Sequence, residues 1–387
     1  MSWLETEPMN EKIKFISAFL ELKHECTFKE LCSRFNISCK TGYKYINRYE
    51  SEGIDGLKER SRAPHNNAKK LPQQIEERIL EAKTKYPYWG SKKISNWLTQ
   101  EYQETQWPAK STIDELFKRH GLVRASKRKR RTAPYMEPFI KIEHPNDSWS
   151  IDYKGQFRLG NNQLCYPLTV TDNFSRYLLA VEGSERISGV STKEVLTRLF
   201  TEFGLPLGIR SDNGPPFAGT GVGGLSRLSV WLIKLGIVPE RIRPGHPEEN
   251  GRHERMHLTL KKETASPPKW DQKEQQYTFD LFKKMFNEER PHEGIEFKRP
   301  AWLYNQSSRT LPSRIAPVEY DSSVEKTRRV RTNGTMKWLG KEIFLSETLI
   351  GETVGMKPHA ENEWKVFFSF LPIAIFNEKL LKVTKLC

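Results

Sequence analysis

The hydrophobic pattern of this 387-residue chain changes its period near residue 146. Before that point, apolar side chains recur every three or four residues, which is the spacing of helices that bury one face. After it, stretches such as WSIDYKGQF, LCYPLTVTD and RYLLAVE alternate apolar with polar residues and are rich in β-branched and aromatic side chains, as strands are. The chain is also too long for one ordinary core, so we expect several domains of different class.

Residues 1–62 are predicted to form a domain of three helices. Thr27 and Glu30 have the spacing of a capping box at the start of TFKELCSRF, and Ser38 follows the turn NIS as the cap of the next helix. Basic residues recur on that next helix at i, i+4 spacing, at Lys40, Lys44 and Arg48. A short helix, a tight turn and a basic helix favour a helix-turn-helix that reads a DNA groove, although a solvated charged face is the alternative.

Residues 68–124 have the pattern of a second helix-turn-helix domain. Three amphipathic segments follow one another, and the last is predicted to begin at Ser111, with Asp114 at its third position, and to end at Gly121. A basic linker, residues 125–145, comes next and contains SKRKRR. We expect the cations of this linker to bind DNA phosphates, namely Lys127, Arg128, Lys129, Arg130 and Arg131.

The charge balance favours a polyanionic partner. Lys and Arg number 63 against 48 Asp and Glu, so the formal net charge is +15, and double-stranded DNA is the first candidate. No apolar run reaches the roughly 20 residues of a membrane span, and the first residues lack a signal pattern, so we expect a cytoplasmic protein. His24 with Cys26, Cys32 and Cys39 suggests zinc, but these cysteines fall where small apolar residues of helices belong, so we predict no structural zinc.

Three carboxylates stand out in the region with strand-like texture, residues 146–305. Asp152 lies inside the first predicted strand, where an acidic residue is unfavourable unless it has a partner or a task. Asp212 follows the apolar strand GLPLGIRS, at the carboxyl end, where open α/β sheets commonly bind ligands; an ordinary turn is the alternative. Glu254 lies one turn into a helix that Asn250 can cap, and a helix holds a carboxylate rigidly.

Two other glutamates compete with Glu254. Glu248 and Glu249 lie in a stretch rich in Gly, Pro and Asn, which predicts a mobile, hydrated loop. We expect Glu254 to share one helix face with residues further along the same helix, namely His257, Leu258 and Lys261.

The three preferred carboxylates are suited to a pair of Mg²⁺ or Mn²⁺ ions, because these ions take hard oxygen ligands. Such a pair can activate a water or a 3′-hydroxyl for attack on a phosphodiester. Basic residues nearby are candidates for holding the DNA backbone, namely Lys154, Arg252 and Lys261.

The C-terminal residues, 320–387, again have the pattern of short strands. Asn333-Gly334 is a signal for a β-hairpin, and further strand-like segments follow it. A small β-barrel fits this length and pattern. The predicted fold is therefore multidomain, with two N-terminal helical domains, a central α/β domain and a C-terminal barrel.

Five ordered motifs, WSIDYKG, LTVTDNFSRY, IRSDNGPPFA, PEENGRHERMHLTLKKE and FNEERPHEGI with the following Pro300, resemble the catalytic core of DDE transposases of bacterial insertion sequences. These enzymes are related to retroviral integrases and have a ribonuclease H-like fold. The resemblance implies catalytic and metal-binding roles for Asp152, Asp212 and Glu254, with two Mg²⁺ or Mn²⁺ ions per active site. It also implies that the protein hydrolyses the 3′ end of its element and joins that end to target DNA. It further implies a homodimer or higher oligomer on DNA, and a protein that is associated with the nucleoid.

Three points stay open at this stage. Glu248 matches the shorter spacing of retroviral members better, but residues 219–229 look like a loop insertion that accounts for the surplus before Glu254. Asp172 is predicted to start a turn and not to act in catalysis, whereas His292 is a candidate for either a DNA contact or a turn cap. The main alternative function is a sequence-specific DNA-binding regulator with an inactive transposase core.

Overall fold

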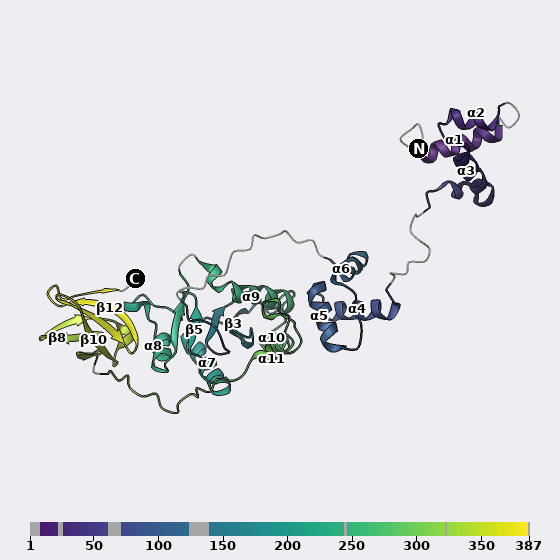
Figure 1. Cartoon of the computed structure of the whole chain (residues 1–387). Helices are drawn as coiled ribbons and strands as arrows, with labels where there is room; N and C mark the ends of the chain where they lie inside the picture. Colours follow the sequence, from purple (N-terminus) through teal and green to yellow (C-terminus); the bar gives the residue numbers. More distant parts are fainter. Residues whose placement is uncertain are drawn as a thin grey trace. The chain divides into compact units, whose positions relative to one another are not determined.

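The structure is a computed structural model that describes residues 8–21, 26–60, 71–123, 139–243, 246–321 and 323–385 (Figure 1). The chain divides into two compact units, Met1–Lys70 and Leu71–Cys387. Among the described helices, none combines the length and the apolar character that crossing a membrane would need.

The first unit consists of three helices and a final 3₁₀ turn. Thr27 accepts a hydrogen bond from the backbone N–H of Glu30, and the Glu30 carboxylate accepts one from the N–H of Thr27, so the predicted capping box is confirmed. Ser38 caps the next helix as expected, by accepting from the N–H of Thr41. Cys32 lies in the apolar core, and burial raises the pKa of its thiol to about 11. The elements are α1 (Pro8–Glu21), α2 (Phe28–Arg34), α3 (Cys39–Glu52) and η1 (Gly53–Leu57).

The second unit begins with another group of three helices, α4 (Gln73–Lys85), α5 (Ser91–Glu101) and α6 (Lys110–Arg119). Their shared core contains Trp89, Trp97 and Phe117. The predicted cap at Ser111 is wrong, because the N-cap of α6 is Ala109, two residues earlier, and it makes no side-chain capping bond. Lys110 instead forms an i, i+4 ion pair with Asp114 at 2.9 Å, which stabilises the first turn.

Side chains of this helical group contact helices that follow the central sheet. Lys85 pairs with Glu289 at 3.2 Å, and Arg299 donates to the side chain of Gln100 at 3.1 Å. Met285 packs against the apolar cores on both sides. The second helical group and the central domain therefore belong to one compact unit, which the sequence pattern did not predict.

The central domain is built on a six-stranded mixed sheet. β1 pairs antiparallel with β3, β3 pairs antiparallel with β4, and β1, β5 and β6 run parallel. β1, β3 and β4 correspond to the three strand-like segments named from the sequence, and β5 to the predicted apolar strand before Asp212. The strands are β1 (Ser148–Tyr153), β2 (Phe157–Arg158), β3 (Leu164–Asp172), β4 (Leu178–Ser184), β5 (Gly208–Ser211) and β6 (Val238–Arg241).

Helices cover both faces of this sheet (Figure 1). On one face, Trp149 and Ile151 of β1 pack with apolar side chains of α7 (Gly189–Phe203) and α8 (Arg227–Lys234). On the other face, α9 (Gly251–Thr264) and α10 (Gln272–Glu288) contribute apolar side chains to a second core. Because side chains alternate along a strand, β1 presents Ser150 and Asp152 on the α9 face. Short elements complete the domain: η2 (Val222–Gly224), η3 (Pro247–Asn250), η4 (Glu293–Ile295) and α11 (Pro300–Leu303).

A buried ion pair ties the three parallel strands together. Arg210 of β5 pairs with Glu240 of β6 at 3.3 Å, and both side chains are almost fully buried. The Ser148 hydroxyl of β1 donates to the same carboxylate at 2.9 Å. Because an unpaired buried charge is costly, this group disfavours sliding of the strands that carry the candidate acids.

The C-terminal strands form a five-stranded sheet and a separate hairpin, and within the described residues their pairing does not close into the predicted barrel. The predicted hairpin at Asn333-Gly334 is wrong, because β7 pairs with the distant β10 and not with β8. The hairpin turn lies instead at Leu339-Gly340, where both residues have positive φ. The elements are β7 (Lys326–Arg329), β8 (Thr335–Trp338), β9 (Lys341–Phe344), η5 (Glu347–Leu349), β10 (Thr353–Ala360), β11 (Glu363–Phe368), β12 (Leu371–Asn377) and β13 (Lys382–Lys385).

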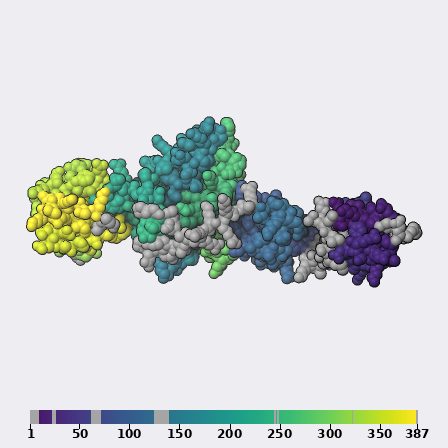
Figure 2. Space-filling model, turned by 90° about the horizontal axis from the view of Figure 1, so that it is seen from above, coloured from purple at the N-terminus to yellow at the C-terminus, as the bar shows by residue number. Residues whose placement is uncertain are grey.

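The loop expected to be an insertion, residues 219–229, packs against this C-terminal sheet. Val222 and Leu225 belong to the same buried core as Met336 and Phe368. Gly223 lies so close to Ile373 that an added Cβ would approach it to 3.0 Å. Figure 2 shows the teal part of the central domain against the yellow-green C-terminal strands. The segment after Asp212 is therefore part of the contact between the central domain and the C-terminal sheet.

We predict that Leu225→Ala loosens this contact. Leu225 is fully buried, so losing its side chain should cost about 2–5 kcal/mol of stability locally. Hydrogen exchange of peptides from β10, β11 and β12 should become faster in the full-length protein. Leu339→Ala is the control, because Leu339 is 86% exposed and its loss should change stability by no more than about 0.5 kcal/mol. Equal exchange in both variants would contradict the prediction.

Candidate active site

Asp152 lies near the end of the central strand β1, opposite Thr169 of β3. Its neighbour Ile151 points into the apolar core, so the Asp152 side chain lies on the face that α9 covers. The side chain is 23% exposed, which leaves room for a ligand to reach it. Within the described residues, Asp152 forms no ion pair with a lysine or arginine, and β1 is not an edge strand.

Asp212 directly follows β5, the strand that runs parallel to β1. Its carboxylate accepts a hydrogen bond from the N–H of Gly214 at 3.2 Å, which fixes the turn that leaves the sheet. Asp212 therefore lies at the carboxyl end of an apolar strand, as its sequence position predicts.

Glu254 lies in the first turn of α9, where the positive end of the helix dipole favours a carboxylate. Asn250 is the N-cap residue as predicted, although its side chain makes no capping hydrogen bond. The expected shared face is wrong for one of its members: Glu254, Leu258 and Lys261 are all exposed, whereas His257 is buried. The buried face consists of His253, Met256, His257, Leu260 and Thr264, because these residues follow helical spacing towards the sheet.

The charges of the three carboxylates interact. The pKa of Asp152 is raised to about 7 by burial, by the charge of Asp212 and, more weakly, by that of Glu254. Lys154 opposes this shift only in part. Clustered oxygen donors with surplus negative charge are the donor set that Mg²⁺ or Mn²⁺ takes, so the residues fit such a cation.

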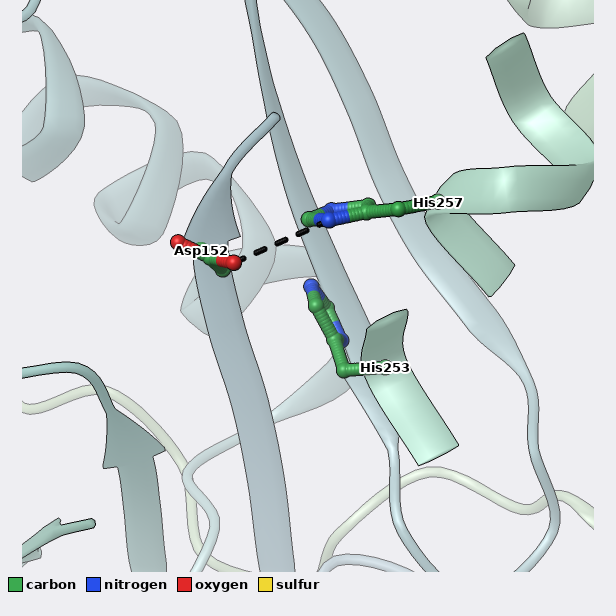
Figure 3. Close-up of side chains that lie close together, drawn as sticks. All are labelled: Asp152, His253 and His257. Atoms are coloured by element: carbon green, nitrogen blue, oxygen red, sulfur yellow. Dashed lines mark ion pairs between the residues drawn. The ribbon is translucent and has the colours of Figure 1, made fainter. Parts of the chain in front are cut away.

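Two histidines of α9 form a buried polar layer beside Asp152 (Figure 3). Thr169 Oγ1 lies 2.7 Å from Nε2 of His253 and 2.6 Å from Nε2 of His257. Thr171 Oγ1 lies 2.9 Å from Nδ1 of His253. Burial lowers the pKa of His253 far below its usual value and that of His257 to about 3, so both rings are neutral. Nδ1 of His257 faces Asp152 Oδ2 at 3.6 Å.

The sequence analysis did not assign a role to this histidine layer. The signal was present, since His253 and His257 are four residues apart on a helix and Thr169 and Thr171 are two apart on a strand. Side-chain atoms of Asp152, His253 and His257 lie within 4.8 Å of one another, which is compatible with a metal site. His253, however, already has a hydroxyl partner on each ring nitrogen, so only His257 Nδ1 has a free lone pair there.

Three other residues that the sequence singled out, Glu249, Asp172 and His292, make contacts that stabilise the fold. Glu249 is not on a hydrated loop: its side chain is fully buried and pairs with Arg243 at 2.7 Å, because the short η3 helix turns it inward. The side chain of Glu248 lies outside the described residues. Asp172 starts a turn as predicted, accepting from the N–H and hydroxyl of Ser175. His292 precedes η4 without a capping bond and packs on Phe286.

The structure describes some of the residues that are predicted to contact DNA, and others lie outside the described ranges. Lys40 and Lys44 are exposed on α3 and Arg48 is partly exposed. Arg252 and Lys261 are exposed on α9, on either side of Glu254. The basic linker residues lie outside the described residues, namely Lys127, Arg128, Lys129, Arg130 and Arg131.

Known protein families match these regions. A helix-turn-helix domain matches residues 11–65, and a homeodomain-like domain matches residues 41–117. Two integrase core domain families match residues 142–247 and 235–300. Residues 142–300 are thus similar to an integrase core. This core carries all three candidate acids and the histidine layer.

Relatives of the integrase core occur in bacterial insertion elements. An uncharacterised 31.7 kDa protein of insertion element IS407 from Burkholderia multivorans is 25% identical over 49% of this chain. An uncharacterised 39.2 kDa protein of insertion element IS476 from Xanthomonas euvesicatoria is 27% identical over 46%. The chain spans 66% and 49% of these two relatives' own lengths.

A solved structure, the HTLV-2 integrase catalytic core domain in complex with magnesium, aligns with 41% of this chain and 97% of its own at 16% identity and a TM-score of 0.33. The family matches and the insertion-element relatives confirm the resemblance to insertion-sequence transposases. They also confirm the helix-turn-helix regions and the ribonuclease H-like core of the predicted fold. The C-terminal barrel is not confirmed.

Proposed function

We propose that this protein is a DNA transposase of insertion-sequence type, which hydrolyses the 3′-end phosphodiester of its element and joins that end to target DNA. The observation that carries the proposal is that the charges of Asp212 and Glu254 add to burial in raising the pKa of Asp152, with Asp152 on β1, Asp212 directly after the parallel strand β5 and Glu254 on α9. This negative charge destabilises the ionised form of Asp152 unless a cation is bound. The integrase core and the insertion-element relatives support the choice of a phosphodiester substrate.

Asp152, Asp212 and Glu254 would together hold one or two Mg²⁺ or Mn²⁺ ions. Bound ions supply Lewis-acid polarisation of the phosphate and lower the pKa of an attacking hydroxyl. The chain itself supplies rigidity, because β1 and β5 are tied by the Arg210–Glu240 pair and Glu254 is held on a helix. Lys154 and Arg252 flank the acids and are suited to phosphate oxygens.

The DNA-binding part of the proposal rests on the helix-turn-helix regions. Exposed Lys40 and Lys44 on α3 would contact the element ends, and the basic linker and Lys261 would contact the backbone. Two ends must be brought together for transposition, so we propose a homodimer or higher oligomer on DNA. We place this activity in the cytoplasm, at the nucleoid, where the DNA substrate lies.

The test is a cleavage and strand-transfer assay on DNA that carries the sequences flanking the coding region, with and without Mg²⁺ or Mn²⁺. The proposal expects 3′-end nicks and joined products that depend on the metal. Specific binding without cleavage under any divalent metal would instead favour a DNA-binding regulator with an inactive core.

We predict that the double variant Lys40→Gln, Lys44→Gln weakens DNA binding by an electrostatic route. Each lost phosphate contact should reduce the slope of log K against log salt by about 1. Binding to element ends should therefore be weakened most at low salt, as measured by fluorescence anisotropy. Lys58→Gln in the same unit is the matched control, because Lys58 already pairs with Asp55 at 2.5 Å. A double variant with the wild-type slope would remove these lysines from the DNA interface.

A further inference from the structure

The contacts of Thr169 support one arrangement of protons in the histidine layer. Thr169 Oγ1 lies 3.2 Å from the carbonyl oxygen of Asp152, 2.7 Å from Nε2 of His253 and 2.6 Å from Nε2 of His257. When the single hydroxyl hydrogen is donated to that carbonyl oxygen, both Nε2 atoms are donors, and His253 and His257 are each protonated on Nε2. A neutral imidazole has only one N–H, which leaves Nδ1 of each ring as a lone pair.

The two Nδ1 lone pairs have different surroundings. That of His253 accepts a hydrogen bond from the Thr171 hydroxyl at 2.9 Å. That of His257 points at a carboxylate oxygen of Asp152, and their 3.6 Å separation is too long for a hydrogen bond (Figure 3). A lone pair that faces a carboxylate oxygen is unfavourable unless a proton or a cation lies between them.

A divalent ion fits between these two atoms. Two ligand atoms that are each about 2.1 Å from one ion are at most about 4.2 Å apart, so atoms 3.6 Å apart can bind the same ion. Metal-ligating histidines also donate their other ring N–H to an oxygen that fixes the ring, and Thr169 is such a partner for His257.

We propose that His257 is a nitrogen ligand in the metal site of Asp152 and that it makes this site favour Mn²⁺ and Co²⁺ over Mg²⁺. The physical reason is that imidazole binds first-row transition ions better than it binds Mg²⁺, which takes oxygen ligands. The inference rests on the proposed function, because it treats Asp152 as a metal ligand. The new element is a mixed nitrogen and oxygen donor set, with Thr169 as the positioning residue.

The experiment measures metal affinity directly in the full-length protein, without DNA. Mn²⁺ binding is followed by the EPR signal of free Mn²⁺, Mg²⁺ by its competition with Mn²⁺, and Co²⁺ by its visible absorption. The key variant is His257→Asn, which replaces the ring nitrogen near Asp152 with an amide. We expect it to lower Mn²⁺ and Co²⁺ affinity about tenfold, to leave Mg²⁺ affinity within about threefold, and to weaken the Co²⁺ bands.

A second pair of variants, at Thr169, tests whether its hydroxyl positions the His257 ring, and it includes a conservative variant that controls for misfolding. Thr169→Val removes the hydroxyl that fixes His257 and should lower Mn²⁺ affinity about tenfold, whereas Thr169→Ser retains the hydroxyl and should restore it. His359→Asn, at an exposed histidine of the C-terminal sheet, is the control for incidental imidazole binding and should have no effect. Circular dichroism establishes that each variant is folded.

The outcomes separate this inference from the proposed function. Asp152→Asn should weaken binding of all three ions, and if it does not, the metal role of Asp152 fails and the proposed function with it. If Asp152→Asn weakens binding but His257→Asn and Thr169→Val leave the ratio of Mn²⁺ to Mg²⁺ affinity unchanged, only the role of His257 is overturned.

Discussion

Replacing any one of the three acids should abolish phosphodiester chemistry while leaving DNA binding in place. We expect Asp152→Asn, Asp212→Asn and Glu254→Gln each to reduce metal-dependent cleavage and strand transfer by about 10³-fold or more. These variants are nearly isosteric and remove a negative charge from a crowded site, so the fold should not suffer. Binding of element ends, which we assign to the helix-turn-helix regions, should stay within about threefold of the wild type.

Glu248→Gln is the matched control for this series. Glu248 is the rival for the third acid on spacing alone, and it lies in η3, just before the helix that holds Glu254. We expect this variant to cleave and join DNA at near wild-type rates in the same assay. An inactive Glu248→Gln together with an active Glu254→Gln would reverse the assignment. Full activity of all three acid variants would refute the proposed chemistry altogether.

The core should lose stability in mild acid because two histidines are buried in their neutral form. The pKa of each ring is lowered in the folded state, whereas the unfolded chain takes up protons near pH 6.5. Below pH 6.5 the unfolded state binds more protons, so the free energy of unfolding falls as pH falls. At pH 5 each histidine should lower the free energy of unfolding by about 2 kcal/mol, whereas Asp152, whose pKa is raised to about 7 in the folded state, should raise it by about 2 kcal/mol, so the net loss should be about 2 kcal/mol.

The measurement is hydrogen exchange of β1 and β3 peptides between pH 7 and pH 5 in metal-free full-length protein, corrected for the intrinsic exchange rate. His257→Gln should remove the contribution of that ring, about 2 kcal/mol at pH 5, because its amide does not titrate and can occupy the position of Nε2 near Thr169. His359→Gln, at the exposed C-terminal histidine, should leave the pH dependence unchanged. A wild-type dependence in His257→Gln would mean that other groups cause the acid sensitivity.

Much of the secondary structure followed from local sequence. The capping box of Thr27 and Glu30 and the cap at Ser38 are interactions between residues three apart, so a short window of sequence contains both partners. The alternation of β1 and β3 likewise follows from side chains that point to opposite faces. The hairpin expected at Asn333-Gly334 did not form, because β7 pairs with the distant strand β10 and not with β8.

Sequence alone also singled out Asp152, Asp212 and Glu254, because an acid inside a strand, an acid at a strand end and an acid on a helix each stand out locally. Their electrostatic coupling, by contrast, depends on tertiary structure, since it requires β1 and β5 to lie side by side and α9 to cover them. Tertiary structure also buried Glu249 against Arg243 and placed the insertion after Asp212 against the C-terminal sheet.

The histidine layer is the clearest case of what only tertiary structure decided. The i, i+4 pair on α9 and the period-two threonines on β3 are visible in the sequence, but each pattern is more often plain packing. The Thr169 hydroxyl lies within hydrogen-bond distance of both histidine rings only because α9 packs on β3. Local patterns therefore determined which residues face which way, whereas contacts between residues more than 80 positions apart decided what those residues can do.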